Sequence, residues 1–124
     1  MTLAHVTLPT RRFDETVEFF ETVLEFPRVL PPDEIAMRAM WFQIGRDEQI
    51  HVLEIDGVPD PVADGEFGRH VALRLRQARW LHIRDRLTAA NFQIIAPQRQ
   101  SRENRFFVLD PNGYCFEFVC DPTF

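Results

Sequence analysis

One order of secondary-structure signals occurs twice along this chain, and this repeat limits the fold more than any other feature. A short β-prone segment at 3–8, which Pro9 is expected to end, opens the first half. Apolar residues then recur every three or four positions across 13–25, a spacing that predicts an amphipathic helix. Further strands are predicted at 35–39, 41–44 and 49–55.

After a stretch rich in glycine, proline and aspartate at 56–65, the same order begins again. The second half is predicted to contain a strand at 70–75, a helix at 77–90, and strands at 93–95, 106–109 and 114–119. Between the last two strands, the sequence Asp110-Pro111-Asn112-Gly113 is typical of a tight turn. We therefore predict an α+β protein in which residues 1–124 form a single domain of two βαβββ modules, about 1–58 and 66–124.

Four potential metal ligands fall at matching places in the two modules. His5 and His70 lie in or at the start of the first strands, at an offset of 70 − 5 = 65 residues. His51 and Glu117 lie in the last strands, at an offset of 117 − 51 = 66 residues. Neutral imidazole and carboxylate groups are ligands for divalent ions when they converge in space.

Strand parity adds to this pattern, because alternate residues of a strand face opposite sides of a sheet. The immediate neighbours of the four candidates are mostly apolar, including Ile50, Val52, Phe116 and Phe118. Each candidate is thus predicted to face away from the side that packs on the helices. A curved mixed sheet with helices on its outer face would then enclose a concave metal site. The alternative is that each histidine is a hydrogen-bonded structural residue.

Composition excludes several functions. The net charge of −5 gives no basic surface for nucleic acid or for an anionic membrane. All 14 positive side chains are arginines, so chemistry that needs a lysine amine is excluded. No apolar run is long enough to span a bilayer and the N-terminal segment does not resemble a signal peptide. Two cysteines five positions apart favour a reducing, cytoplasmic location.

The chain resembles the vicinal oxygen chelate superfamily, which includes glyoxalase I, fosfomycin-resistance thiol transferases, bleomycin-resistance proteins and extradiol dioxygenases. The resemblance covers nearly the whole chain and is most specific in the Asp-Pro-x-Gly turn with Glu117 four residues after the glycine. It implies that His5, His70 and Glu117 bind a divalent ion in an open site. His51 is a departure, because glyoxalase-like members carry Glu or Gln there.

The resemblance implies a metal-dependent enzyme of glyoxalase type, a lyase or isomerase, whose small substrate chelates Zn, Ni, Fe, Mn or Co through adjacent oxygens. Glu117 is the candidate general base, and Arg74 and Arg105 are candidates for binding an anionic group of the substrate. An Fe(II) extradiol dioxygenase is the first alternative, because two histidines and a glutamate form the ligand set of such enzymes. A drug-binding dimer without catalysis is the second, and fosfomycin thiol transfer is a lesser variant. A homodimer is expected, because each module forms only an open half-cup and pairing of modules completes it.

Overall fold

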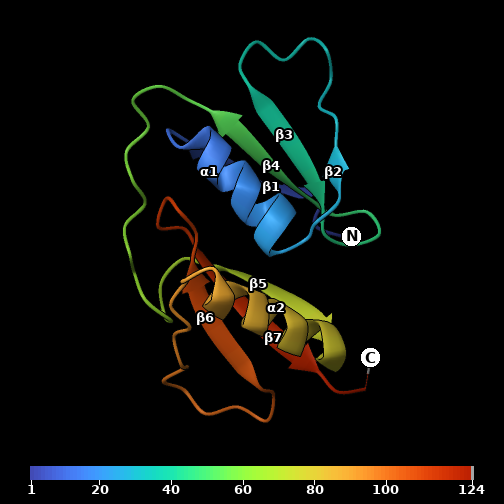
Figure 1. Ribbon diagram of the computed structural model, residues 1–124, viewed down its shortest axis with the longest axis vertical. Coiled ribbons are helices and arrows are strands. Elements are labelled where there is room, and N and C mark those ends of the chain that lie inside the picture. The colour runs from blue at the N-terminus through green and yellow to red at the C-terminus, as the bar shows by residue number, and fades with distance from the viewer. Residues whose placement is uncertain (124) are drawn as a thin grey trace. The chain divides into compact units, whose positions relative to one another are not determined.

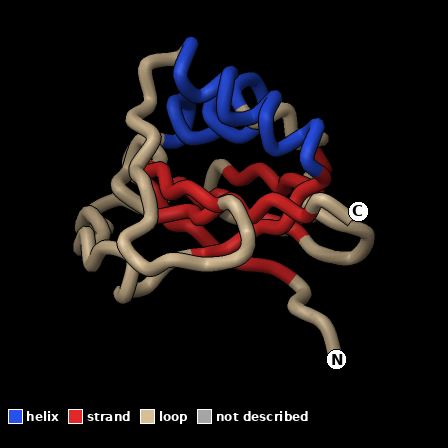
Figure 2. Tube along the Cα trace, turned by 90° about the horizontal axis from the view of Figure 1, so that it is seen from below, coloured by secondary structure: helices blue, strands red, loops and turns tan. Residues whose placement is uncertain are grey.

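The computed structural model describes residues 1–123 and separates the chain into two compact units, Met1–Asp60 and Pro61–Phe124 (Figure 1). Each unit contains a small mixed sheet with helix on one of its faces (Figure 2). The predicted α+β class is therefore confirmed, whereas the predicted curved sheet around a site remains a prediction. Within the described residues, none of the helices has the length and apolar character needed to cross a membrane.

The first unit contains a four-stranded sheet in the order β1-β4-β3-β2. Its elements are β1 (His5–Thr10), α1 (Phe13–Glu18), the π-helix η1 (Phe19–Val23), β2 (Arg28–Val29), β3 (Ala39–Gln43) and β4 (Gln49–Glu54). Strands β1 and β4 are parallel, whereas β3 runs antiparallel to both β4 and β2. Phe20, Phe42, Ile50 and Val52 are fully buried and form the centre of this unit's core.

Three features of this unit differ from the predictions. Pro9 does not end β1 but lies inside it, which is tolerated because β1 is an edge strand and one side of its backbone needs no partner. The segment 35–38 is not a strand, since β4 ends at Glu54 and its pairing with β3 extends only as far as Ala39 opposite Leu53. The short strand β2 forms at a place where no strand is predicted from the sequence.

The second unit contains a three-stranded sheet in the order β5-β7-β6, with β5 parallel to β7 and β6 antiparallel to it. Its elements are β5 (Val71–Arg76), α2 (Gln77–Ala89), β6 (Arg105–Leu109) and β7 (Cys115–Asp121). Helix α2 packs on β5 and β7, and Trp80 Nε1 donates a hydrogen bond to the Phe118 carbonyl at 2.9 Å. The strand predicted at 93–95 is reduced to one bridge between Ile95 and Phe107.

The two units share a register as well as an order of elements. In the first unit, His51 pairs with Thr7, which lies two residues after His5. In the second unit, Glu117 pairs with Ala72, which lies two residues after His70. In both units, therefore, the first histidine is a diagonal neighbour of the candidate ligand on the last strand. The two sheets thus share a register, whereas the division of the chain into two βαβββ modules stays a prediction.

Candidate metal centre

In the first unit, His5 and His51 lie side by side on the sheet face away from the core. Their rings are stacked, with centroids 4.0 Å apart and planes 12° from parallel. Trp41 of β3 stacks on the other face of His51 at 3.7 Å. Burial, followed by the nearby charge of His5, lowers the pKa of His51. His51 thus lies between two rings, and its burial together with the charge of His5 favours the neutral imidazole.

One nitrogen of His51 already has a partner. The Nε2 atom donates to Oε1 of Gln49 at 2.8 Å, and Gln49 in turn donates to Gln43 at 3.1 Å, which fixes the orientation of its amide. Lone pairs of an imidazole lie in the plane of the ring, so those of two stacked rings run side by side instead of converging. His5 and His51 can bind one ion together only after one ring turns.

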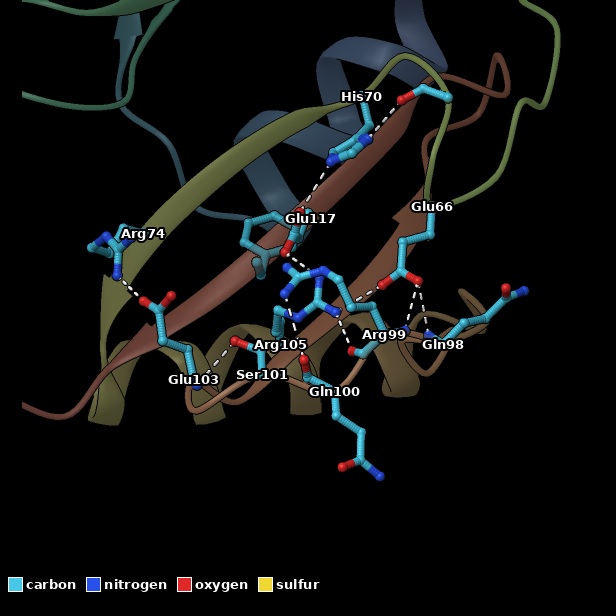
Figure 3. A network of polar contacts seen from close by, with 12 residues as sticks. Glu66, His70, Arg74, Gln98, Arg99, Gln100, Ser101, Glu103, Arg105 and Glu117 are labelled. Atoms are coloured by element: carbon cyan, nitrogen blue, oxygen red, sulfur yellow. Dashed lines mark hydrogen bonds and ion pairs between the residues drawn. The ribbon is translucent and has the colours of Figure 1, made fainter.

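In the second unit, His70 and Glu117 are in direct contact. The Nε2 atom of His70 lies 3.0 Å from Oε1 of Glu117, and Nδ1 lies 3.0 Å from the Gly68 carbonyl (Figure 3). Because a carbonyl oxygen only accepts, Nδ1 is the nitrogen that carries the hydrogen. In a neutral ring, the lone pair of Nε2 therefore faces a carboxylate oxygen, which is also an acceptor. Two such acceptors at 3.0 Å need a positive charge between them, either a proton or a metal ion.

This second pair fits a divalent ion. Nitrogen and oxygen donors that each lie roughly 2.1 Å from an ion, in adjacent coordination positions, are about 3.0 Å apart. A histidine whose second nitrogen donates to a backbone carbonyl is also the usual arrangement of a metal ligand. Each unit brings two of the four candidates together. Over residues 1–123 the structure contains no cluster of three or more His, Cys, Asp or Glu side chains that could hold a metal, so the four-ligand site remains a prediction.

The second oxygen of Glu117 is bound by Arg105 of β6. Arg105 Nη1 donates to Oε2 of Glu117 at 3.0 Å, and Nη2 donates to Oε1 of Glu66 at 2.8 Å. The three side chains are almost completely buried, with exposures of 4% for Arg105, 8% for Glu66 and 9% for Glu117. Hydrogen bonds, first of all the one to Glu117, raise the pKa of Arg105 above its usual value. Figure 3 shows the guanidinium between the two carboxylates.

Arg74, the other predicted substrate-binding residue, is exposed. Its side chain is 56% accessible and forms an ion pair with Glu103. It extends from β5 in the same sheet as Glu117 (Figure 3). A role of Arg74 or Arg105 in binding substrate stays a prediction.

The turn that precedes β7 is held by a buried carboxylate. Oδ1 of Asp110 accepts hydrogen bonds from the backbone N–H groups of Asn112, Gly113 and Tyr114 at 2.8–3.0 Å. Burial raises the pKa of Asp110, against these hydrogen bonds, which lower it. Gly113 adopts a φ of 102°, which suits glycine. The predicted tight turn is confirmed, and it connects β6 to the strand that carries Glu117.

Sequence reasoning missed several residues that contact the candidates. Trp41 could have been found, because it shares strand parity with the exposed face of the sheet and is aromatic. Gln49 lies two residues before His51 and therefore on the same face. Glu66 gave no usable signal, since it lies in an irregular segment 51 residues before Glu117. A small apolar cavity of about 180 Å³, lined in part by Glu66, Phe107 and Cys115, was also not anticipated.

Comparison with known proteins identifies the family of the chain. Residues 2–118 match the model of the glyoxalase/bleomycin resistance protein/dioxygenase superfamily. Among curated proteins, none matches the chain in sequence at a significant level.

Three solved structures show the same fold at low sequence identity. A protein assigned to the glyoxalase family from Bacillus anthracis superposes with a TM-score of 0.82 and 19% identity, covering 98% of this chain and 95% of that one. A glyoxalase/dioxygenase from Nostoc punctiforme superposes with a TM-score of 0.79 and 16% identity, and the match covers 98% of this chain and 91% of that one. The third is a variant of the fosfomycin resistance protein FosX from Listeria monocytogenes, complexed with Mn(II) and 1S,2S-dihydroxypropylphosphonic acid. It superposes with a TM-score of 0.74 and 16% identity, and the match covers 96% of this chain and 91% of that one. The chain belongs to the glyoxalase/bleomycin resistance protein/dioxygenase superfamily.

Proposed function

We propose that the protein is a divalent-metal enzyme that acts on a small substrate chelating the ion through two adjacent oxygens. His5, His70 and Glu117 are its proposed ligands, with His51 as the fourth. Zn, Ni, Fe, Mn and Co are all compatible with imidazole and carboxylate ligands. The proposal requires the histidine pair of the first unit to join His70 and Glu117, within one chain or across a dimer.

The contact between His70 and Glu117 carries the proposal. The Nε2 atom of His70 lies 3.0 Å from Oε1 of Glu117, and the Gly68 carbonyl places a hydrogen on Nδ1, so in a neutral ring two acceptors face each other. A purely structural histidine would be better satisfied by one donor and one acceptor. The matched register of His5 and His51 supplies a second pair of nitrogen ligands.

A lyase or isomerase of glyoxalase type is the activity that these residues support best. A bound divalent ion would polarise one of the chelating oxygens of the substrate. Glu117 would help to hold the ion, and its carboxylate, once free of the ion, would accept a proton from the substrate. Arg74 attracts an anionic substituent of the substrate from the exposed end of the face. The Mn(II) and vicinal diol phosphonate in the FosX variant are a ligand combination of this kind.

An Fe(II) extradiol-type dioxygenase is the second candidate, and one observation favours it. Because Nε2 of His51 is bound to Gln49, the ligand set can reduce to His5, His70 and Glu117. Two histidines and one carboxylate leave open positions for catechol and oxygen on Fe(II).

The first experiment measures metal content and turnover together. Protein purified without chelator or His-tag should contain, or bind, about one divalent ion per chain, as measured by elemental analysis and calorimetry. Activity is then assayed with a panel of chelating substrates: the thiol adducts of methylglyoxal, catechols, and fosfomycin with thiols. Glu117→Gln should retain the fold and much of the metal affinity but lose turnover, because an amide cannot accept the proton.

Two outcomes would contradict the proposal. Failure of Zn²⁺, Ni²⁺, Co²⁺, Mn²⁺ and Fe²⁺ to bind stoichiometrically removes the metal centre. Lack of turnover with every metal, together with binding of an apolar drug that is unchanged in Glu117→Gln and His70→Ala, supports the drug-binding module instead.

The proposed assembly is a homodimer with a two-fold axis, the commonest arrangement for a small protein of this kind. Light scattering at micromolar concentration should give twice the chain mass of 14.6 kDa. A mass equal to one chain contradicts the dimer and requires the site to be completed within the chain.

A further inference from the structure

Glu117 is held on both of its oxygens by different partners. Oε1 faces Nε2 of His70, whereas Oε2 accepts from Nη1 of Arg105. A carboxylate held at one oxygen alone can rotate about its terminal torsion, which is broad and nearly unrestrained. The bond to Arg105 therefore fixes which oxygen of Glu117 faces His70.

Arg105 is itself held by a second carboxylate. Its Nη2 atom donates to Oε1 of Glu66 at 2.8 Å and to the Arg99 carbonyl. Its Nε atom has no partner among the described residues, so the two Nη groups alone direct the guanidinium. With a side-chain exposure of only 4%, this cation is largely shielded from water and its contacts are correspondingly strong.

Glu66 connects this cation to an adjacent loop. Its Oε2 atom accepts the backbone N–H groups of Gln98 and Arg99 at 3.0 and 2.9 Å, while Oε1 is bound to Arg105 (Figure 3). A glutamine at this position would place its amide N–H group against either the Arg105 guanidinium or the two backbone N–H groups, which are themselves donors. Glu66 therefore orients Arg105 and anchors the loop before β6 at the same time.

We propose that Arg105 and Glu66 are positioning residues for Glu117: Arg105 holds Oε2 so that Oε1 is presented beside His70, and Glu66 holds Arg105. This inference rests on the proposed metal function. Outer contacts that orient a ligand typically change metal affinity by about 10–100-fold when removed. The same two residues also connect the loop at 98–99 to the metal ligand, so a change in that loop should be detected at the site.

The test uses Mn²⁺ and Co²⁺ alone as probes of the full-length protein. Arg105→Met removes the cation at similar length, and Arg105→Lys keeps a charge that can reach only one carboxylate well. Glu66→Gln removes the anchor of Arg105. Arg38→Met is the matched control, because Arg38 also bridges two carboxylates, Asp14 and Glu54, but is exposed and lies in the other unit. The readouts are the metal Kd from calorimetry, the visible spectrum of bound Co²⁺, and the ring ¹⁵N shifts of His70 in metal-free protein.

Arg105→Met should weaken metal binding by about 10–100-fold and change both the Co²⁺ spectrum and the His70 shifts. The metal Kd values of Arg105→Lys and Glu66→Gln should lie between those of Arg105→Met and wild type. The Kd of Arg38→Met should equal that of wild type. If Arg105→Met does not fold, the Lys and Gln variants decide.

A Kd within about twofold of wild type, with unchanged His70 shifts, would overturn the positioning role. If wild-type protein binds no metal, the proposed function fails on that result alone. The His70 shifts in metal-free protein then decide the positioning role by themselves.

Discussion

The two units place their candidate ligands in the same register but hold them by different physical means. In the first unit, His51 is stacked between the rings of His5 and Trp41. In the second, Glu117 lies between His70 and a buried arginine. The backbone geometry is repeated, whereas the chemistry that supports each ligand is not.

The difference follows from the residue on the last strand of each unit. A buried carboxylate needs a cation or several donors to offset its desolvation, and Arg105 on the neighbouring strand supplies one. A half-buried imidazole can remain neutral, so aromatic stacking on Trp41 is sufficient for His51. The residues of the second unit are therefore expected to supply most of the metal affinity, and those of the first unit a smaller part.

The largest expected effect tests that ranking directly. His70→Ala should weaken metal binding by at least about 100-fold, because it deletes a proposed ligand whose Nε2 atom already lies 3.0 Å from Oε1 of Glu117. His51→Ala should weaken it by about tenfold or less, because Nε2 of His51 is bound to Gln49. Calorimetric titration with Zn²⁺ or Mn²⁺ measures both. Equal losses would mean that the two units contribute alike.

An intermediate effect is expected on stability, where a buried arginine is compared with an exposed one. Arg105→Met should lower the free energy of unfolding by about 3 kcal/mol, because two carboxylates then remain buried without their cation. Arg38→Met should cause little change, because its ion pairs with Asp14 and Glu54 are exposed to solvent. Denaturant unfolding of the metal-free proteins gives the two values. Similar losses would show that the buried network is no stronger than a surface one.

The smallest effect concerns the tryptophans, which report on the units separately. Metal binding should change the emission of Trp41 in a Trp80→Phe variant, because Trp41 stacks on His51. The emission of Trp80 in a Trp41→Phe variant should stay nearly constant, since Trp80 packs on the opposite face of its sheet from Glu117. A titration in which Trp41 is unaffected would argue against metal contact in the first unit.

Much of the fold could be predicted from local pattern. Helix periodicity located α2 and the helical segment formed by α1 and η1, and the sequence Asp110-Pro111-Asn112-Gly113 located the last turn. Predictions failed where pairing partners decide the outcome. Ile95 forms only a bridge to Phe107, and the apolar segment at 35–38 has no strand beside it. A strand exists only where a neighbouring strand accepts its hydrogen bonds, and a single sequence does not give that neighbour.

Only the structure showed that His5 stacks on His51 and that His70 contacts Glu117. The sequence by itself determined the order of elements in the two halves, and it predicted that the four candidates share one face of the sheet. These follow from offset and parity, which are properties of spacing along the chain. Only the tertiary structure showed that Arg105 contacts Glu117 and that Glu66, from an irregular segment, orients Arg105. Such contacts form where side chains that are distant in the sequence meet in the low-dielectric interior of the protein. The periodic pattern of a sequence does not indicate where they meet.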